Sequence, residues 1–175
     1  NEDHSDFQQQ RFIAMLRGYV EFDEDPEAIL DIGCGKAPYM AMLMRLFGDA
    51  KYIGIDRKVL PVQKEIESPE ATFFYSDARR LDELLHGPFD FVLSRSPNIK
   101  DGDEWREIYT KARGVMGRGI FVGTTYSQEA HELQSTALEE AGFTIEKAAE
   151  NPFLVTSSAD NAKFMMDNYL LFARP

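Results

Sequence analysis

Short apolar runs of strand length alternate along this chain with longer segments whose apolar residues recur at helical spacing. Residues 5–20 form the first helical pattern, which predicts an amphipathic N-terminal helix. Three more helical patterns cover Tyr39–Phe47, Glu104–Met116 and Ser127–Ala141. Seven apolar runs predict strands over Ala28–Ile32, Lys51–Ile55, Ala71–Tyr75, Phe89–Ser94, Gly119–Gly123, Phe143–Lys147 and Asn168–Ala173.

This alternation predicts an α/β fold with a doubly wound, seven-stranded sheet. Strands joined by helices run parallel with right-handed crossovers, so the sheet is expected to be mostly parallel with helices on both faces. The last connection differs, because Lys147 and Asn168 are separated by a polar segment with only a short helical pattern at Ala162–Met166. Little room is left for a crossover helix, so the last strand is expected to run antiparallel to its neighbour.

No repeat, low-complexity tract or linker divides the 175 residues, so we expect a single domain over residues 1–175. Residues 1–26 are expected to form a helical extension, and residues 27–175 the core that carries the candidate site. The chain begins at Asn1 without a methionine, so residues are expected upstream of it.

Composition limits the classes of partner, metal site and location that are expected for this chain. Lys and Arg number 19 against 30 Asp and Glu, for a net charge of −11, which disfavours nucleic acid because phosphate binding requires clustered cations. Cys34 is the only cysteine, so a disulfide framework and a cysteine metal site are excluded. The three histidines are widely separated, and we expect no metal. No apolar stretch approaches the roughly 20 residues of a membrane span, and no secretory signal is recognisable, so a cytoplasmic location without membrane association is expected.

Candidate chemistry begins at the turn Asp31–Pro38, directly after the first predicted strand. Glycines at positions 33 and 35 allow backbone N–H groups to approach a bound cofactor closely. Asp56 lies 25 residues after Asp31, at the tip of the second strand, where a carboxylate commonly holds a ribose diol. Together these features predict an adenosine-type cofactor.

The third position of the dinucleotide fingerprint, G-x-G-x-x-G/A, is Pro38 in this chain. Proline has no N–H to donate, and its ring disturbs close packing of the helix on the strand. A nicotinamide-dependent oxidoreductase is therefore the weaker interpretation.

The ordered motifs resemble those of the class I S-adenosylmethionine-dependent methyltransferases, whose first motif reads D/E-x-G-x-G-x-G. Asp31, Gly33 and Gly35 match it, and Ala37 replaces the last glycine. The resemblance continues through Asp56, Tyr75–Ala78, Phe89–Ser94, Met116–Ile120, Gly142–Phe143 and Asn168–Phe172.

This resemblance implies S-adenosylmethionine as cofactor and assigns residues to each part of it. Asp31 would accept a hydrogen bond from the amino group, with the Gly33 and Gly35 backbone beside the methionine portion. Asp56 would bind the ribose hydroxyls, and Ser94 would lie at the strand end that faces the methyl group. Asp77 would accept from the adenine amine, with the Ala78 N–H facing the ring.

Each assignment has a structural alternative. Asp31 could cap a turn, Asp77 could begin a helix, and the two glycines could mark a tight turn without a ligand. Asp56 could cap the next helix, which is compatible with ribose binding. Cys34 reads as a small spacer, with a redox role as the alternative.

The acceptor side carries weaker signals. Residues 94–98 lack the Asn/Asp-Pro-Pro-Tyr/Phe motif of related enzymes that methylate amides or bases, which disfavours those acceptors. Arg95 could bind a carboxylate or phosphate of the acceptor, or lie solvated in a loop. Asn98 and Tyr126 could line an acceptor pocket or simply pack. No general base, and so no catalytic residue, is identified.

Three functions follow from this sequence. The favoured one is a methyltransferase that uses S-adenosylmethionine on a small-molecule acceptor rather than on nucleic acid. A non-catalytic cofactor-binding or scaffolding protein with the same fold is the alternative, and an NAD(P)-dependent oxidoreductase is the third. Neither the acceptor atom nor the oligomeric state follows from the residues.

Overall fold

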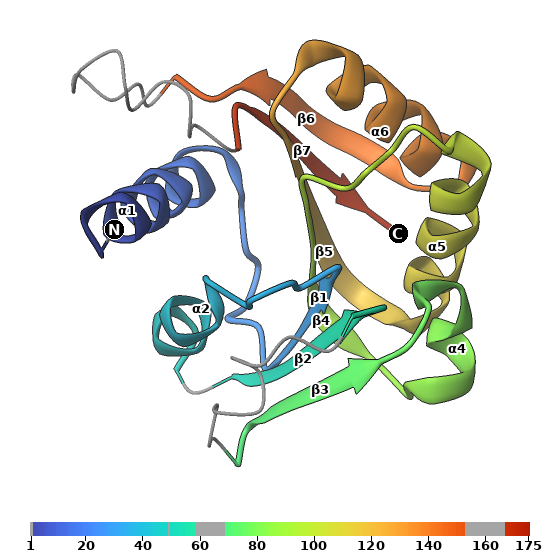
Figure 1. Ribbon diagram of the computed structural model, residues 1–175, viewed down its shortest axis with the longest axis horizontal. Helices are drawn as coiled ribbons and strands as arrows, with labels where there is room; N and C mark the ends of the chain where they lie inside the picture. Colours follow the sequence, from blue (N-terminus) through green and yellow to red (C-terminus); the bar gives the residue numbers. More distant parts are fainter. Residues whose placement is uncertain (1, 49, 59–68, 153–166) are drawn as a thin grey trace.

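The computed structural model describes residues 2–48, 50–58, 69–152 and 167–175. Seven strands form one twisted sheet in the order β3-β2-β1-β4-β5-β7-β6 (Figure 1). The strands are β1 (Ala28–Ile32), β2 (Lys51–Asp56), β3 (Ala71–Tyr75), β4 (Phe89–Arg95), β5 (Met116–Thr125), β6 (Thr144–Glu150) and β7 (Tyr169–Arg174).

The pairing of the strands confirms the predicted topology. β1 pairs in parallel with β2 and β4, β2 with β3, and β4 with β5. β7 runs antiparallel to both β5 and β6. The helical pattern at Ala162–Met166 lies outside the described residues. The strand order reverses between β1 and β4, and a parallel sheet binds ligands at the carboxyl ends of its strands at such a point.

Helices cover both faces of the sheet, as predicted. Figure 1 shows α1 and α2 on one side and α4, α5 and α6 on the other. Side-chain caps begin three of them, because Asp77 accepts from the Arg79 N–H, Asp101 from the Glu104 N–H and Ser127 from the Ala130 N–H. The helices are α1 (Glu2–Tyr19), α2 (Met40–Leu46), the 3₁₀ turn η1 (Ala78–Arg80), α4 (Leu81–Leu84), α5 (Gly102–Val115) and α6 (Gln128–Glu140).

Two apolar layers sandwich the sheet. Alternation along β1 sends Leu30 and Ile32 into the layer under α4, α5 and α6, and Ile29 into the layer under α1 and α2. Phe12 and Met15 of α1 are fully buried in the second layer. The N-terminal helix therefore packs on the sheet itself.

Candidate functional site

The turn after β1 follows a left-handed backbone path. Gly33 and Gly35 have φ angles of 70° and 52°, a region that glycine enters without strain. Ala37 has a φ of 49°, so alanine occupies a conformation that costs a non-glycine residue roughly 1–2 kcal/mol. The N–H groups of Gly33 and Cys34 donate to the carbonyl of Ile55, at 2.8 and 3.2 Å, which fixes the turn to β2.

Asp56 joins the end of β2 to this turn. Its Oδ2 accepts from the Gly35 N–H at 3.0 Å, and its Oδ1 accepts from the Lys58 N–H at 2.9 Å. These residues border a cavity of about 420 Å³, which lies in the usual range for small-ligand sites. The cavity is lined by Ile32, Gly33, Gly35, Ile55, Asp56, Arg57, Lys58, Ser76, Ala78, Asn98, Glu104, Trp105 and Ile108.

Asp31 lies behind the turn with only 4% of its surface exposed. Burial raises the pKa of its carboxyl to about 6, although a hydrogen bond from the Tyr52 hydroxyl and the nearby charge of Arg95 both lower it. Tyr52 belongs to β2, one strand away. Sequence reasoning did not identify this partner, because an aromatic residue in a strand normally indicates core packing. Cys34 is also buried, and burial raises the pKa of its thiol, which disfavours a redox role.

Asp77 is engaged in ion pairs. Arg79 Nη2 lies 2.6 Å from its Oδ2, and Arg57 Nη2 lies 3.3 Å from the same atom. The side-chain hydrogen bond from Arg79 lowers the pKa of Asp77 to about 2, against a small opposing effect of burial. Arg57 also pairs with Glu104, which lines the cavity, whereas Asp77 does not. Ala78, its neighbour, does line the cavity.

Ser94 directs its side chain toward α5 and α6. Its hydroxyl is fully buried and lies 3.1 Å from the Tyr109 hydroxyl, which also accepts from the Gln134 amide at 3.0 Å. This network fixes the end of β4 against the helices. Ser94, which was predicted to lie at the strand end that faces the methyl group, thus has its side chain in contact with α5 and α6.

Arg95 is held in a buried polar network. Its Nε and Nη2 donate to the two carboxylate oxygens of Asp167, each at 3.2 Å. Its guanidinium carbon lies 3.6 Å from the centre of the Tyr39 ring. Tyr39 and Thr124 also donate to Asp167, at 2.8 and 2.5 Å. Sequence reasoning missed Asp167, which lies in a polar segment without a motif and contacts residues distant in the chain.

Of the two remaining candidates, one lies at the cavity and the other outside it. Asn98 lines the cavity, and its carbonyl accepts from the Trp105 indole at 2.9 Å. Tyr126 follows β5 and is 58% exposed, outside the residues that line the cavity. Among the described residues, no group of three or more His, Cys, Asp or Glu side chains is placed to hold a metal ion.

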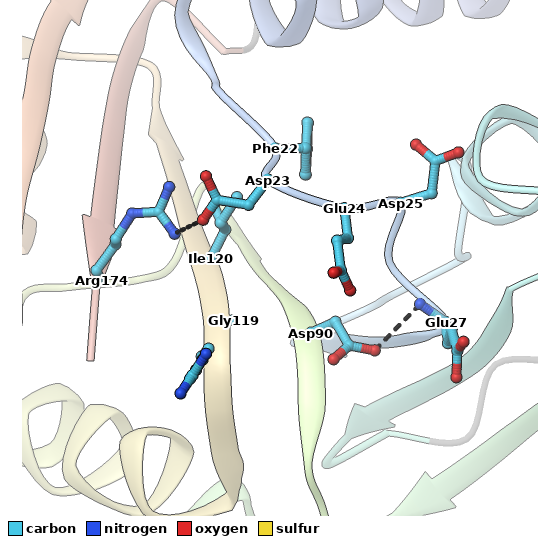
Figure 2. A pocket seen from close by; sticks show the side chains of 10 residues that line it. Phe22, Asp23, Glu24, Asp25, Glu27, Asp90, Gly119, Ile120 and Arg174 are labelled. Carbon is cyan, nitrogen blue, oxygen red and sulfur yellow. Dashed lines mark hydrogen bonds and ion pairs between the residues drawn. The ribbon is translucent and has the colours of Figure 1, made fainter.

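A second cavity, of about 370 Å³, lies near the amino-terminal ends of β1, β4 and β5 and the carboxyl end of β7. Figure 2 shows Asp23 turned toward Arg174 and Asp90 turned toward the backbone of Glu27. Arg174 lies 3.2 Å from Asp23, and Asp90 accepts from the Glu27 N–H at 3.0 Å. These contacts connect the segment after α1 to β4 and β7, on the edge opposite the glycine turn.

The site fits an S-adenosyl cofactor by its chemistry. A side-chain carbon added at Gly33 or Gly35 would meet no atom within 4 Å, so the turn borders open space. Asp56 places a carboxylate beside that turn, as a ribose diol requires, and Asp31 places a second one behind it. Ile32, Ile55 and Ile108 supply apolar walls for a planar base.

Comparisons with known proteins agree with this fit. Residues 29–119, more than half of the chain, match the family model described as a methyltransferase domain. No curated protein matches the sequence. An S-adenosylmethionine-dependent methyltransferase from Mesorhizobium loti is 17% identical, with a TM-score of 0.64 over 94% of this chain and 98% of that one.

Two other solved structures share the fold. The magnesium protoporphyrin IX methyltransferase of Synechocystis, solved with bound S-adenosylmethionine, is 16% identical, with a TM-score of 0.62 over 96% of this chain and 79% of its own. The [4+2]-cyclase SpnF is 16% identical, with a TM-score of 0.66 over 94% of this chain and 80% of its own. The family match, the sheet order and the chemistry of the turn lead to one conclusion: this chain belongs to the methyltransferase-domain family, and its cofactor is S-adenosylmethionine.

Proposed function

We propose that this protein transfers the methyl group of S-adenosylmethionine to a small-molecule acceptor. The observation that carries the proposal is the contact between Asp56 and the Gly35 N–H at the edge of the cavity. That contact places a carboxylate beside a backbone turn whose glycines leave open space above them. The same carboxylate also fixes the turn to β2, so it holds the turn in place and faces the cavity at once.

The cofactor supplies a sulfonium-bound methyl group, and the residues of the chain align it. Asp56 would accept hydrogen bonds from the ribose hydroxyls, and Asp31 would pair with the amino group of the methionine portion. The Ala78 N–H would face the adenine ring. Displacement at a methyl group is an in-line reaction, so alignment and exclusion of water are the main contributions of such a site.

A small acceptor is supported by charge. The net charge of −11 repels polyanions, and the adjacent cations Arg79 and Arg80 are each paired with a carboxylate, Asp77 and Glu83 respectively. No helix among the described residues has the length and apolar character to cross a bilayer. The net charge and these ion pairs both favour a small acceptor over a polyanion.

The fold alone does not distinguish transfer from other uses, because the SpnF cyclase shares it. A scaffolding role is the second candidate, and the absence of a recognisable acceptor motif at residues 94–98 favours it. Binding and transfer therefore have to be measured separately.

Calorimetric titration with S-adenosylhomocysteine tests the cofactor site. Asp56→Ala is expected to weaken binding by about tenfold to a hundredfold, since charge-assisted hydrogen bonds contribute about 1.5–3 kcal/mol each. Asp103→Ala is the matched control, because Asp103 pairs with Arg106 on the exposed face of α5. An unaltered affinity in Asp56→Ala would contradict the assignment.

Transfer is then followed with methyl-labelled cofactor and a fractionated metabolite extract. Label in a small-molecule fraction supports the proposal. Tight cofactor binding with no labelled product in metabolite, protein or nucleic-acid fractions would favour the scaffolding role instead.

A further inference from the structure

The guanidinium of Arg95 uses only part of its hydrogen-bonding capacity within the chain. Arginine carries five N–H donors, and two of them are directed at Asp167. Among the described residues, no acceptor contacts the other three. The side chain is 13% exposed, so part of it reaches solvent, and we call the edge that carries the other three N–H groups the outer edge.

This outer edge is rigidly oriented. Asp167 fixes the inner edge through two parallel hydrogen bonds, and the Tyr39 ring lies against the planar face at 3.6 Å. Asp167 is itself only 1% exposed and accepts further hydrogen bonds from Tyr39 and Thr124. A ligand that binds this edge would therefore not pay the entropy cost of ordering the Arg95 side chain, which favours affinity.

Arg95 lies at the carboxyl ends of the parallel strands, where the cofactor is proposed to bind. Arg95 is the last residue of β4, the strand that follows the reversal of strand order. Asp31 pairs with Leu93 in the register of β1 and β4, so Arg95 lies two residues further along β4, toward the methionine end of the proposed cofactor site. The next residue, Ser96, has a φ of 44° and a buried hydroxyl without a partner among the described residues.

We propose that the outer edge of Arg95 binds a carboxylate next to the transferred methyl group, and that the acceptor supplies it. This proposal rests on the methyltransferase function proposed above. Two parallel N–H groups of a guanidinium match the two oxygens of a carboxylate, and the match is tightest where water is partly excluded. The methionine portion of the cofactor carries the same group, so the test separates the two sources.

The experiment uses the full chain saturated with S-adenosylhomocysteine. Benzoate and its neutral counterpart benzamide are titrated while ligand NMR signals are followed. The variants are Arg95→Lys, which keeps the charge but loses the fork, and Arg95→Gln/Asp167→Asn, which removes both charges together. Arg106→Lys, an exposed arginine on α5, is the control, and melting curves verify folding.

Benzoate but not benzamide is expected to bind wild type and Arg106→Lys, with at least about tenfold weaker binding in both Arg95 variants. A tenfold loss of S-adenosylhomocysteine affinity in these variants, with methylthioadenosine binding unchanged, would assign the carboxylate to the cofactor. Unchanged affinities for benzoate, S-adenosylhomocysteine and methylthioadenosine in both Arg95 variants would overturn the carboxylate site. Because wild-type cofactor binding is measured in the same series, its failure would be recognised separately as failure of the proposed function.

Discussion

At the scale of single residues, Asp31 is a buried carboxyl whose charged form costs folding free energy. Burial favours its neutral form, and a pKa of about 6 means that the carboxylate is retained at neutral pH against that preference. Tyr52 and Arg95 offset part of the penalty. A carboxylate held in this way is stabilised further when a cation, such as the cofactor amino group, arrives beside it.

Asp31→Asn is therefore expected to stabilise the cofactor-free protein near neutral pH. The folded-state pKa of Asp31 is raised from 3.8 to about 6, so its neutral form stabilises the fold below pH 4, and this contribution is lost as the pH rises through 6. Asp31→Asn does not lose this contribution. Its free energy of unfolding should therefore rise above that of wild type between pH 4 and 6, by at most about 3 kcal/mol. Urea denaturation at a series of pH values measures it.

Tyr52→Phe is the companion variant. The Tyr52 hydroxyl lowers the pKa of Asp31, so its removal should move the pH-dependent loss of stability to higher pH without abolishing it. Cofactor affinity should fall in Asp31→Asn despite the gain in stability. A pH profile of unfolding that is identical in wild type and Asp31→Asn would contradict the buried, titrating carboxylate.

The sequence located some of these residues and could not locate others. Asp31, Gly35 and Asp56 lie at strand ends, and strand ends are visible as apolar runs followed by polar residues. The interaction of Arg95 with Asp167 spans 72 residues of chain, and no local pattern encodes such a pair. Asp77 illustrates the same limit, because its position was predicted but its ion pairs with Arg57 and Arg79 were not.

At the scale of elements, the glycine turn depends on how closely it packs on β2. A side-chain carbon at Gly54 would lie 2.8 Å from Cys34 Sγ and 2.9 Å from the Phe73 ring. Such distances are not tolerated, so only glycine at this strand position lets the turn and β3 approach together. The close approach explains a glycine inside a strand, where the residue normally weakens pairing.

Gly54→Ala is expected to destabilise the protein by about 1–3 kcal/mol and to weaken cofactor binding, because the turn must move away from β2. Gly114→Ala is the matched control. Gly114 lies in α5 with open space around it, and alanine there should stabilise the helix by about 0.5–1 kcal/mol. Cys34→Ala added to Gly54→Ala should restore part of the stability. Equal unfolding midpoints for Gly54→Ala and wild type would refute the close packing.

Elements were easier to predict than their ends. All seven strands were located by apolar runs, and β7 was placed antiparallel because the preceding segment leaves little room for a helix. No helical pattern was predicted over η1 and α4, since seven residues are too few to show helical periodicity, although Asp77, which caps η1, was named as a possible helix start. β5 extends from Met116 to Thr125, beyond the apolar run Gly119–Gly123, because its ends continue to pair with β4 and β7.

At the scale of the whole molecule, the net negative charge of the chain disfavours the approach of polyanionic acceptors. The excess of 11 negative charges creates a repulsive field for polyanions, and that field is strongest at low ionic strength. Local cations can overcome such a field only when they are unpaired and clustered. Beside the cavity, two arginines are paired, with Arg57 and Arg79 joined to Asp77 and Glu104.

The molecule is therefore expected to bind neither duplex DNA nor structured RNA at about 0.1 M salt, as measured by fluorescence anisotropy with labelled probes. Any weak, nonspecific association of the probe should vanish when an unlabelled polyanion of the same charge is added as a competitor. The double variant Asp77→Asn/Glu104→Gln removes the partners of Arg57 and Arg79, and exposes the cations without adding any. If wild type bound nucleic acid saturably, with log affinity falling steeply against log salt, several phosphate contacts would exist and the small-molecule proposal would be wrong. Binding gained only in the double variant would instead show that these ion pairs exclude polyanions from the cavity.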